Sequence, residues 1–221
     1  MKVLITGSSS GIGLAAAKKF LDNGFEVYGL DLKESSLSHD KYHHYVVDVK
    51  EADKLPEIKS INIIFNNAGL QNSNDDINNN LKGTINVTEK YGFQDEIKAI
   101  LFNASASAWT GQEFPMYVAS KAGVVGYMKN VAIRLAPKQV VVNSISLGGV
   151  LTNSNRPVIE NGDCWEEIMN VTPMKKWMSE VEVADWVYFL TVNNKSMSGQ
   201  DLLIDNGETD LNAKFVWPEE K

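Results

Sequence analysis

Short apolar runs recur along the chain, and segments of helical pattern or turn residues separate them. Runs of this kind favour buried strands. They predict strands at residues 2–6, 25–30, 42–47, 61–65, 99–103, 139–145 and 198–205. Helical patterning occupies residues 14–21, 80–91, 122–135 and 180–190. This alternation predicts an α/β fold, a doubly wound parallel sheet of about seven strands with helices on both faces.

The pattern indicates one domain over residues 1–221, a length that gives an α/β domain a full core. Residues 153–178 are irregular and bulky, and we expect a mobile lid over a substrate there; ordinary packing of a helix pair is the alternative. The segment's large side chains are Trp165, Met169, Met174 and Trp177. The tail, residues 207–221, is apolar, with Phe215, Val216 and Trp217. We expect it to pack on its own domain or on another subunit.

Composition narrows the class of protein. The chain is 43% hydrophobic and 22% charged, as in an ordinary globular enzyme. Its net charge of −7 disfavours nucleic acid and anionic membranes as partners. The single cysteine excludes an internal disulfide, and the three histidines have a spacing that fits no metal set, so we expect no metal. Because no signal peptide or membrane-length apolar run occurs, we expect a cytoplasmic protein.

A glycine-rich turn lies between the first strand and the first helix. It has the sequence Thr-Gly-Ser-Ser-Ser-Gly-Ile-Gly over residues 6–13. Gly7 permits a tight turn, Gly11 lets the backbone approach a pyrophosphate, and Gly13 lets the helix pack close to the strand. A strand, a glycine turn and a helix N-terminus together form an anion site. The turn therefore predicts the phosphate-binding loop of a Rossmann-type sheet.

Two carboxylates end the next two strands. Asp31 lies about 20 residues beyond the glycines, where a carboxylate accepts hydrogen bonds from an adenosine ribose diol and repels a 2′-phosphate. This favours NAD(H), and NADP(H) is the alternative because Lys33 is close by. Asp48 is placed to bind the adenine amino group, although either carboxylate could instead serve a turn.

Tyr117 and Lys121 stand four residues apart at the head of the predicted helix 122–135, on one helix face. Free tyrosine titrates near pH ~10, too high for proton transfer at neutral pH. We expect the lysine cation to lower the tyrosine pKa and so create a general acid/base. A solvated tyrosine and lysine that share a helix by chance are the alternative.

Other polar or small residues follow later strands, at the sheet edge where ligands bind in parallel α/β sheets. Asn-Asn-Ala-Gly at residues 66–69 lets backbone and cofactor meet. Ser105 follows the fifth strand, and Ser107 is its rival for a catalytic hydroxyl. Residues 148–152, Gly-Gly-Val-Leu-Thr, follow the sixth strand.

Together these motifs resemble the short-chain dehydrogenase/reductase family, over residues 1 to about 210. They also include an asparagine before x-x-G at Asn80. The chain is similar to a compact member of the 3-oxoacyl-[acyl-carrier-protein] reductase-like branch. The resemblance implies hydride transfer between a nicotinamide and a carbinol or carbonyl carbon.

The resemblance also implies residue roles. Tyr117 would be the general acid/base, Lys121 would lower its pKa and bind the nicotinamide ribose, and Ser105 would hold the substrate oxygen. Asn80 would position a water that links Lys121 to solvent. The implied cofactor-binding residues are Gly7, Ser9, Ser10, Gly11, Ile12, Gly13, Asp31, Leu32, Asp48, Val49, Asn67, Ala68, Gly69, Tyr117, Lys121, Gly148, Val150 and Thr152.

Three departures from the family pattern stand out. The loop from Ser105 to Tyr117 is slightly short, and the segment from Gly69 to Asn80 is much shorter than the family's usual helix. Leu147 replaces a common proline, so the turn that grips the nicotinamide loses a fixed φ and is expected to be looser.

We therefore expect an NAD(H)-dependent oxidoreductase acting on a small secondary alcohol or ketone. A catalytically weak or inactive dinucleotide-binding scaffold is the alternative. An epimerase or dehydratase is disfavoured because the chain has no room for a larger substrate domain.

The family resemblance also implies a homodimer or homotetramer. One predicted helix has a face of small and apolar residues that suits contact between subunits; an ordinary face buried within the chain's own core is the alternative. This face comprises Val118, Ala122, Val125 and Met128.

Overall fold

A seven-stranded sheet forms the centre of the computed structural model, which describes residues 1–211. Its strand order is β3-β2-β1-β4-β5-β6-β9, and every neighbouring pair is parallel. The predicted doubly wound sheet is confirmed. Its strands are β1 Lys2–Thr6, β2 Glu26–Asp31, β3 Tyr42–Val46, β4 Ile63–Asn66, β5 Ala99–Asn103, β6 Val141–Leu147 and β9 Asp201–Ile204.

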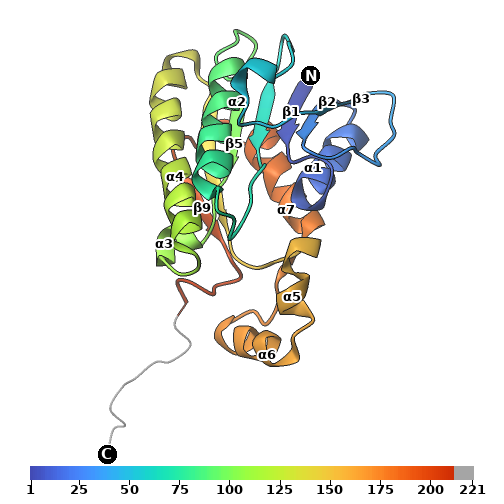
Figure 1. Ribbon diagram of the computed structural model, residues 1–221. Coiled ribbons are helices and arrows are strands. Elements are labelled where there is room, and N and C mark those ends of the chain that lie inside the picture. Colours follow the sequence, from blue (N-terminus) through green and yellow to red (C-terminus); the bar gives the residue numbers. More distant parts are fainter. Residues whose placement is uncertain (212–221) are drawn as a thin grey trace, which may run out of the picture.

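Helices cover both faces of the sheet. Figure 1 shows α2 and α4 on one side and α1 and α7 on the other. The α-helices are α1 Gly11–Asp22, α2 Gly83–Tyr91, α3 Ser107–Thr110, α4 Pro115–Leu135, α5 Arg156–Ile159, α6 Gly162–Val171 and α7 Glu180–Tyr188. Short 3-10 turns are η1 Ala52–Lys54, η3 Ala136–Lys138 and η4 Asn153–Asn155, and π-helical turns are η2 Ile77–Lys82 and η5 Phe189–Asn193. None of the helices within residues 1–211 is long and apolar enough to cross a lipid bilayer.

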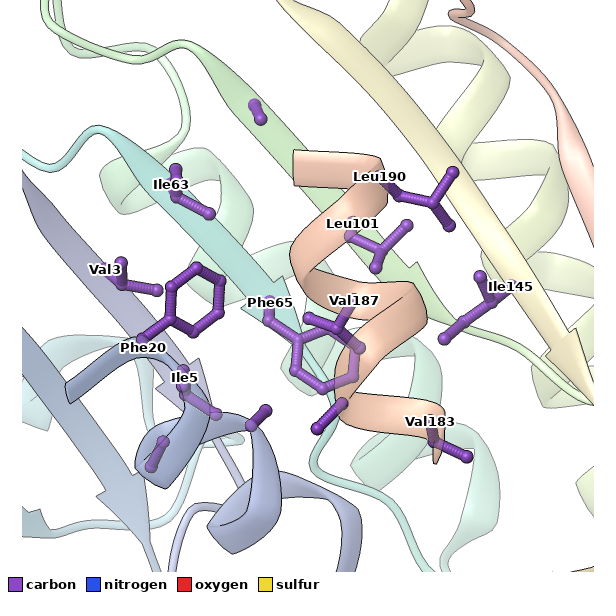
Figure 2. Close-up of a cluster of buried hydrophobic side chains, with 14 of the residues drawn as sticks. Val3, Ile5, Phe20, Ile63, Phe65, Leu101, Ile145, Val183, Val187 and Leu190 are labelled. Atoms are coloured by element: carbon purple, nitrogen blue, oxygen red, sulfur yellow. The ribbon is translucent and has the colours of Figure 1, made fainter. Parts of the chain in front are cut away.

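Two hydrophobic clusters fill the space between the sheet and its helices. In Figure 2, Phe65 and other sheet residues meet Phe20 of α1 and Val187 of α7. The opposite cluster joins Ile64 to α2 and α4. Neighbouring residues of β4 thus point to opposite faces, and because both faces are buried the strand is apolar throughout.

The strand order places the functional edge. The chain starts in the middle with β1, moves outward to β2 and β3, and then returns to β4 on the other side of β1. Strand order reverses between β1 and β4, and ligands of such sheets bind at this reversal, beyond the carboxyl ends of the strands. The loops after β1, β2, β4, β5 and β6 carry the residues singled out above.

Several helix and strand boundaries in the structure differ from those that the sequence predicts. Helix α4 begins at Pro115, seven residues before the predicted start, because proline suits the first helical turn. Tyr117 and Lys121 therefore lie within the first turns of the helix. The sixth strand begins two residues late because Gln139 adopts a left-handed φ of 57°. The fourth strand also begins two residues late, at Ile63.

The lid segment forms α5 and α6, which lie beyond the end of the sheet in Figure 1. All ten residues of α6 remain at least partly exposed, so the helix is not packed into the core. The proposed oligomer face on α4 needs a correction, since Met128 is fully buried in the chain's own core and Val125 packs against that core. The tail residues Phe215, Val216 and Trp217 lie outside the described residues.

Candidate active site

The glycine turn after β1 is held by close backbone packing. A Cβ atom on Gly13 would lie 2.0 Å from the Gly7 carbonyl oxygen, so only glycine fits there. The Thr6 hydroxyl accepts hydrogen bonds from the backbone N–H groups of Asn67 and Ala68, both at 2.9 Å. These bonds fasten the turn to the residues that follow β4, the other side of the strand-order reversal.

The space above the turn suits a phosphate group. Gly11 has a φ of +55°, and a Cβ built on it would meet only Glu180 Oε1 at 3.7 Å and the Thr152 methyl at 3.9 Å among the described residues. The turn leads directly into the N-terminus of α1, whose first N–H groups lack helical partners. Thr152, predicted to contact the cofactor from β6, therefore faces the glycine turn.

Asp31 is fixed by two backbone donors. Its Oδ2 accepts a hydrogen bond from Ser9 N–H and its Oδ1 accepts one from Lys33 N–H, both at 2.9 Å. The Ser9 hydroxyl donates to the Lys33 carbonyl at 3.0 Å. The carboxylate is thus bound to the glycine turn, in the position expected for a ribose-binding group. Leu32 beside it is 56% exposed.

The second carboxylate, Asp48, takes part in a turn. Its Oδ1 accepts a hydrogen bond from Lys50 N–H at 2.9 Å, and its Oδ2 lies 3.6 Å from Lys50 Nζ. Val49 is buried against Gly83 of α2. The turn contact is the alternative that the sequence left open for Asp48, and contact with adenine stays a prediction.

Ser105, Tyr117 and Lys121 come together at the ends of β5 and α4. The Ser105 side chain lies close enough to the Tyr117 phenol to oppose the rise of its pKa, and Ser107 Oγ donates to Ser105 Oγ at 3.0 Å. Lys121 Nζ lies 5.6 Å from the centre of the Tyr117 ring and donates to the Asn103 carbonyl at 2.8 Å. Of the two rival serines, Ser105 is therefore the one beside the phenol, and Ser107 lies behind it.

The pKa values in this cluster correct the sequence-based expectation. Burial raises the pKa of Tyr117 to about 12; the neighbouring Ser105 side chain opposes the rise, and Glu113 and Asp76 add to it. Burial lowers the pKa of Lys121 to about 8. The net lowering of the Tyr117 pKa expected from the sequence is therefore not found in this structure. Removal of the phenol from water outweighs the lysine, whose ammonium donates to Asn103 instead.

Asn80 links the short loop after β4 to α4. Its Oδ1 accepts a hydrogen bond from Leu70 N–H at 2.7 Å, and its Nδ2 donates to the Leu70 carbonyl at 2.8 Å and to Ser120 Oγ at 3.0 Å. It lies in the π-helical turn η2, a feature often found at functional sites. Asn80 is a positioning residue here, and its predicted role in ordering a water stays a prediction.

Comparison with known proteins places this geometry in a family. The family model described as enoyl-(acyl carrier protein) reductase matches residues 7–209. The 3-oxoacyl-[acyl-carrier-protein] reductase FabG of Buchnera aphidicola subsp. Acyrthosiphon pisum (strain APS) is 30% identical, and the alignment covers 92% of this chain and 95% of that one. The chain belongs to the short-chain dehydrogenase/reductase family. The predicted membership of this oxidoreductase family is confirmed.

Solved structures of other proteins have the same fold. The ligand-free aldohexose dehydrogenase of Thermoplasma acidophilum superposes with a TM-score of 0.86 at 26% identity, covering 99% of this chain and 97% of that one. ElxO with bound NADP also gives a TM-score of 0.86, at 25% identity, covering 95% and 99%.

The loop after β6 in this short-chain dehydrogenase/reductase is well supported, although Leu147 replaces the family's proline. Gly148 N–H donates to the Ile204 carbonyl at 3.0 Å, and Met178 N–H donates to the Gly149 carbonyl at 3.2 Å. Thr152 N–H and Asn155 Nδ2 both donate to the Val150 carbonyl at 2.8 Å. These hydrogen bonds constrain the turn without the fixed φ of a proline, and the looser turn expected from Leu147 stays a prediction.

Sequence reasoning missed two residues of this site. Asn103 accepts from Lys121 through its carbonyl and donates through Nδ2 to Asn67 Oδ1 at 2.9 Å. Glu113 has a left-handed φ of 80° and accepts a hydrogen bond from Gln71 Nε2 at 2.6 Å. The position of Asn103 at a strand end was the available signal. Nothing local marked Glu113, because its partner lies 42 residues earlier in the chain.

Glu113 also contributes charge to the cluster of Ser105, Tyr117 and Lys121. The residue as a whole is exposed, yet the protein packed around its carboxyl group raises the pKa; the hydrogen bond from Gln71 opposes this rise and Glu208 adds to it. Its negative charge raises the pKa values of both Tyr117 and Lys121. Glu113 therefore links the short loop after β4, through its bond with Gln71, to the charges around Tyr117 and Lys121.

Proposed function

We propose that this protein transfers a hydride between NAD(H) and a secondary alcohol or ketone, with Tyr117 as general acid/base. The observation that carries the proposal is the meeting of Ser105, Tyr117 and Lys121 at the carboxyl edge of the sheet, where Asn103 and Asn67 link Lys121 to the glycine turn. These residues come from separate elements and provide a hydrogen-bonding hydroxyl, a proton donor and a buried cation.

Each side chain has a defined part in the reaction. In reduction, the Tyr117 hydroxyl donates its proton to the substrate oxygen while Ser105 donates a hydrogen bond to the same oxygen. With a pKa of about 12, Tyr117 keeps its proton at neutral pH until the oxygen becomes basic. Lys121 is protonated below a pH of about 8 and stabilises the phenolate that forms. When bound, the nicotinamide supplies the hydride in reduction and accepts it in oxidation.

The residues present fit a nicotinamide dinucleotide. The open turn at Gly11 suits the pyrophosphate, and the fixed Asp31 carboxylate suits a ribose diol. Asp31 favours NAD(H) by repelling a 2′-phosphate. NADP(H) is the alternative, supported by Lys33 nearby and by ElxO, whose solved structure contains NADP.

We also propose a small-molecule carbonyl or alcohol substrate and a homodimer or homotetramer. Exposed apolar side chains on two helices support association, namely Ile133 on α4 and Val181 and Trp186 on α7. Light scattering at micromolar concentration is expected to give twice or four times the chain mass, and a monomer would contradict this part of the proposal.

The decisive experiment compares Tyr117→Phe with the wild type over a panel of ketones, 3-oxoacyl thioesters and aldoses. Loss of a general acid/base lowers turnover roughly 10²- to 10⁴-fold, whereas NADH affinity is expected to change little. Tyr127→Phe is the matched control, because Tyr127 lies on the same helix and hydrogen-bonds Glu89 far from the cluster. NADH binding without turnover of any panel member by the wild type would favour the scaffold alternative.

A further inference from the structure

Two side chains of β3, the edge strand beside β2 in Figure 1, extend to the glycine turn. Tyr42 and His44 stand two residues apart, so both lie on one face of the strand. The Tyr42 hydroxyl forms hydrogen bonds with Ser8 Oγ of the turn at 3.1 Å and with His44 Nδ1 at 3.2 Å. His44 Nε2 donates to the Lys33 carbonyl at 2.8 Å. Tyr42 and His44 thus connect the glycine turn to the loop that follows Asp31.

These bonds close a ring with the bonds that fix Asp31. The Lys33 carbonyl also accepts a hydrogen bond from the Ser9 hydroxyl at 3.0 Å. The backbone N–H groups of Ser9 and Lys33 donate to the two oxygens of the Asp31 carboxylate. The ring therefore joins three elements: the glycine turn, the end of β2, and β3. Its members are Ser8, Ser9, Asp31, Lys33, Tyr42 and His44.

A glycine of β2 makes room for this ring. Gly29 pairs with His44 in the sheet register, and a Cβ atom built on it would overlap both Ser8 Oγ and Tyr42 Oη. Ser8 is fully buried, and its hydroxyl is satisfied by Tyr42. The aromatic rings of Tyr42 and His44 stack with their centres 5.9 Å apart and their planes at 29°. The ring is therefore a packed feature of the fold, and a side chain at position 29 would disrupt it.

The ring determines how the Asp31 carboxylate is presented. The sheet holds the Asp31 backbone, since Val47 N–H donates to the Asp31 carbonyl at 2.8 Å. The side chain depends on Ser9 and Lys33, and Lys33 begins to leave the sheet: residues 32–41 form no helix or strand, and residues 32–34 are exposed. Without the bond from His44, cofactor binding would have to order the start of this loop, which opposes binding.

We propose that Tyr42 and His44 are cofactor-positioning residues, which hold the glycine turn and the Asp31 carboxylate in the arrangement that binds the adenosine half of the cofactor. This inference rests on the proposed function. Neither side chain has to touch the cofactor, because Tyr42 acts through Ser8 and His44 acts through Lys33. Since Asp31 is the group that favours a ribose diol over a 2′-phosphate, the two residues also support the preference for NAD(H).

The first test uses His44→Leu, which removes the bond to the Lys33 carbonyl. Calorimetry would measure the affinities of NADH, NADPH and ADP-ribose, which lacks the nicotinamide. NADH and ADP-ribose should both bind about tenfold more weakly, because binding then has to order about one residue of backbone. NADPH, which lacks the ribose diol, should lose less affinity, so the preference for NADH narrows. His43→Leu is the matched control, because His43 lies on the opposite face of β3 and contacts Glu26.

Two further variants separate positioning from general support of the fold. His44→Gln keeps an N–H donor for the Lys33 carbonyl and should restore most of the NADH affinity. Tyr42→Phe removes only a hydroxyl and should weaken NADH binding about threefold to fivefold. Combined with His44→Leu, it should weaken binding by less than the product of the separate effects, because both act through one ring. Circular dichroism would check folding, and Tyr42→Phe carries the test if His44→Leu does not fold.

The outcomes separate the two proposals. If the wild type binds neither NADH nor NADPH, the proposed function fails and this inference fails with it. If the wild type binds NADH and the His44→Leu and Tyr42→Phe variants bind it equally well, only the inference is overturned. Equal weakening of NADH and NADPH, without rescue by His44→Gln, would mean a general structural role and would also overturn it. A wild type that prefers NADPH would show that Asp31 serves no ribose diol; the inference would then fail while the proposed hydride transfer stands.

Discussion

Lys121 should reduce the stability of the fold while it serves the active site. Its side chain is only 5% exposed, and among residues 1–211 its ammonium has one hydrogen-bond acceptor, the Asn103 carbonyl at 2.8 Å. Burial lowers its pKa from 10.5 to about 8, against opposing effects of Glu113 and Asp76. At about 1.4 kcal/mol per pKa unit, this difference corresponds to about 3 kcal/mol.

The sign of the effect follows from proton binding. Below a pH of about 8 the folded and unfolded chains both carry the Lys121 proton, and the full cost of burying the charge is present. Between about 8 and 10.5 the unfolded chain binds more protons than the folded one, so stability rises with pH. Above 10.5 both forms are neutral and the cost disappears.

Replacing Lys121 by methionine keeps an unbranched side chain and removes the charge. The variant loses the hydrogen bond to Asn103, which costs about 1 kcal/mol. We therefore expect Lys121→Met to be about 2 kcal/mol more stable than the wild type at pH 7, although its activity is lost. The advantage should shrink steadily from pH 8 to pH 10, because only the wild type gains stability over that range.

Urea unfolding at pH 7, 8, 9 and 10 would measure the difference. Lys129→Met is the matched control, since Lys129 is exposed on the same helix and should show little effect at any pH. A Lys121→Met protein that is less stable than the wild type by the same amount at every pH would refute the reasoning. It would mean that Glu113 and Asp76 fully compensate the buried charge.

Three further predictions concern the same site. Asp31→Asn should weaken NADH binding and narrow or reverse the preference over NADPH in calorimetry, because the charge that repels a 2′-phosphate is gone; an unchanged ratio would show that Asp31 does not select the cofactor. Glu113→Gln should lower the Tyr117 pKa, so alcohol oxidation should begin at a lower pH. Because burial raises the Glu113 pKa, the stability of the wild type should also fall, relative to that of the variant, as pH rises above about 4.5. An identical pH–rate profile would argue against this coupling. Asn80→Ala should leave Leu70 N–H and the Leu70 carbonyl without partners, cost about 2 kcal/mol in urea unfolding, and lower turnover more than NADH affinity; stability equal to the wild type would contradict the loop-fixing role.

Local pattern was sufficient for the sheet and the glycine turn. The strand predicted at residues 99–103 matches β5, because an apolar run of that length in a parallel sheet depends on little except burial of both faces. The positions of Asp31 and Ser105 relative to strand ends also followed from the sequence. Helix α4 is longer than its apolar pattern predicts, because Pro115 stabilises the first turn without contributing to that pattern.

The sequence by itself therefore determined the fold class, the family and the edge of the sheet that carries the chemistry, since these follow from periodicity and from residue types at short spacing. Only the tertiary structure decided the side-chain environment. The Tyr117 pKa rises because distant segments bury the phenol, and Asn80 is occupied by Leu70 and Ser120. Likewise, Trp177 meets Gly149 only because β7 (Val150–Leu151) and β8 (Met178–Ser179) pair across the 26 residues that separate them. Desolvation and long-range contacts depend on which residues, distant in the sequence, pack around a site. Local sequence pattern contains no information about those residues.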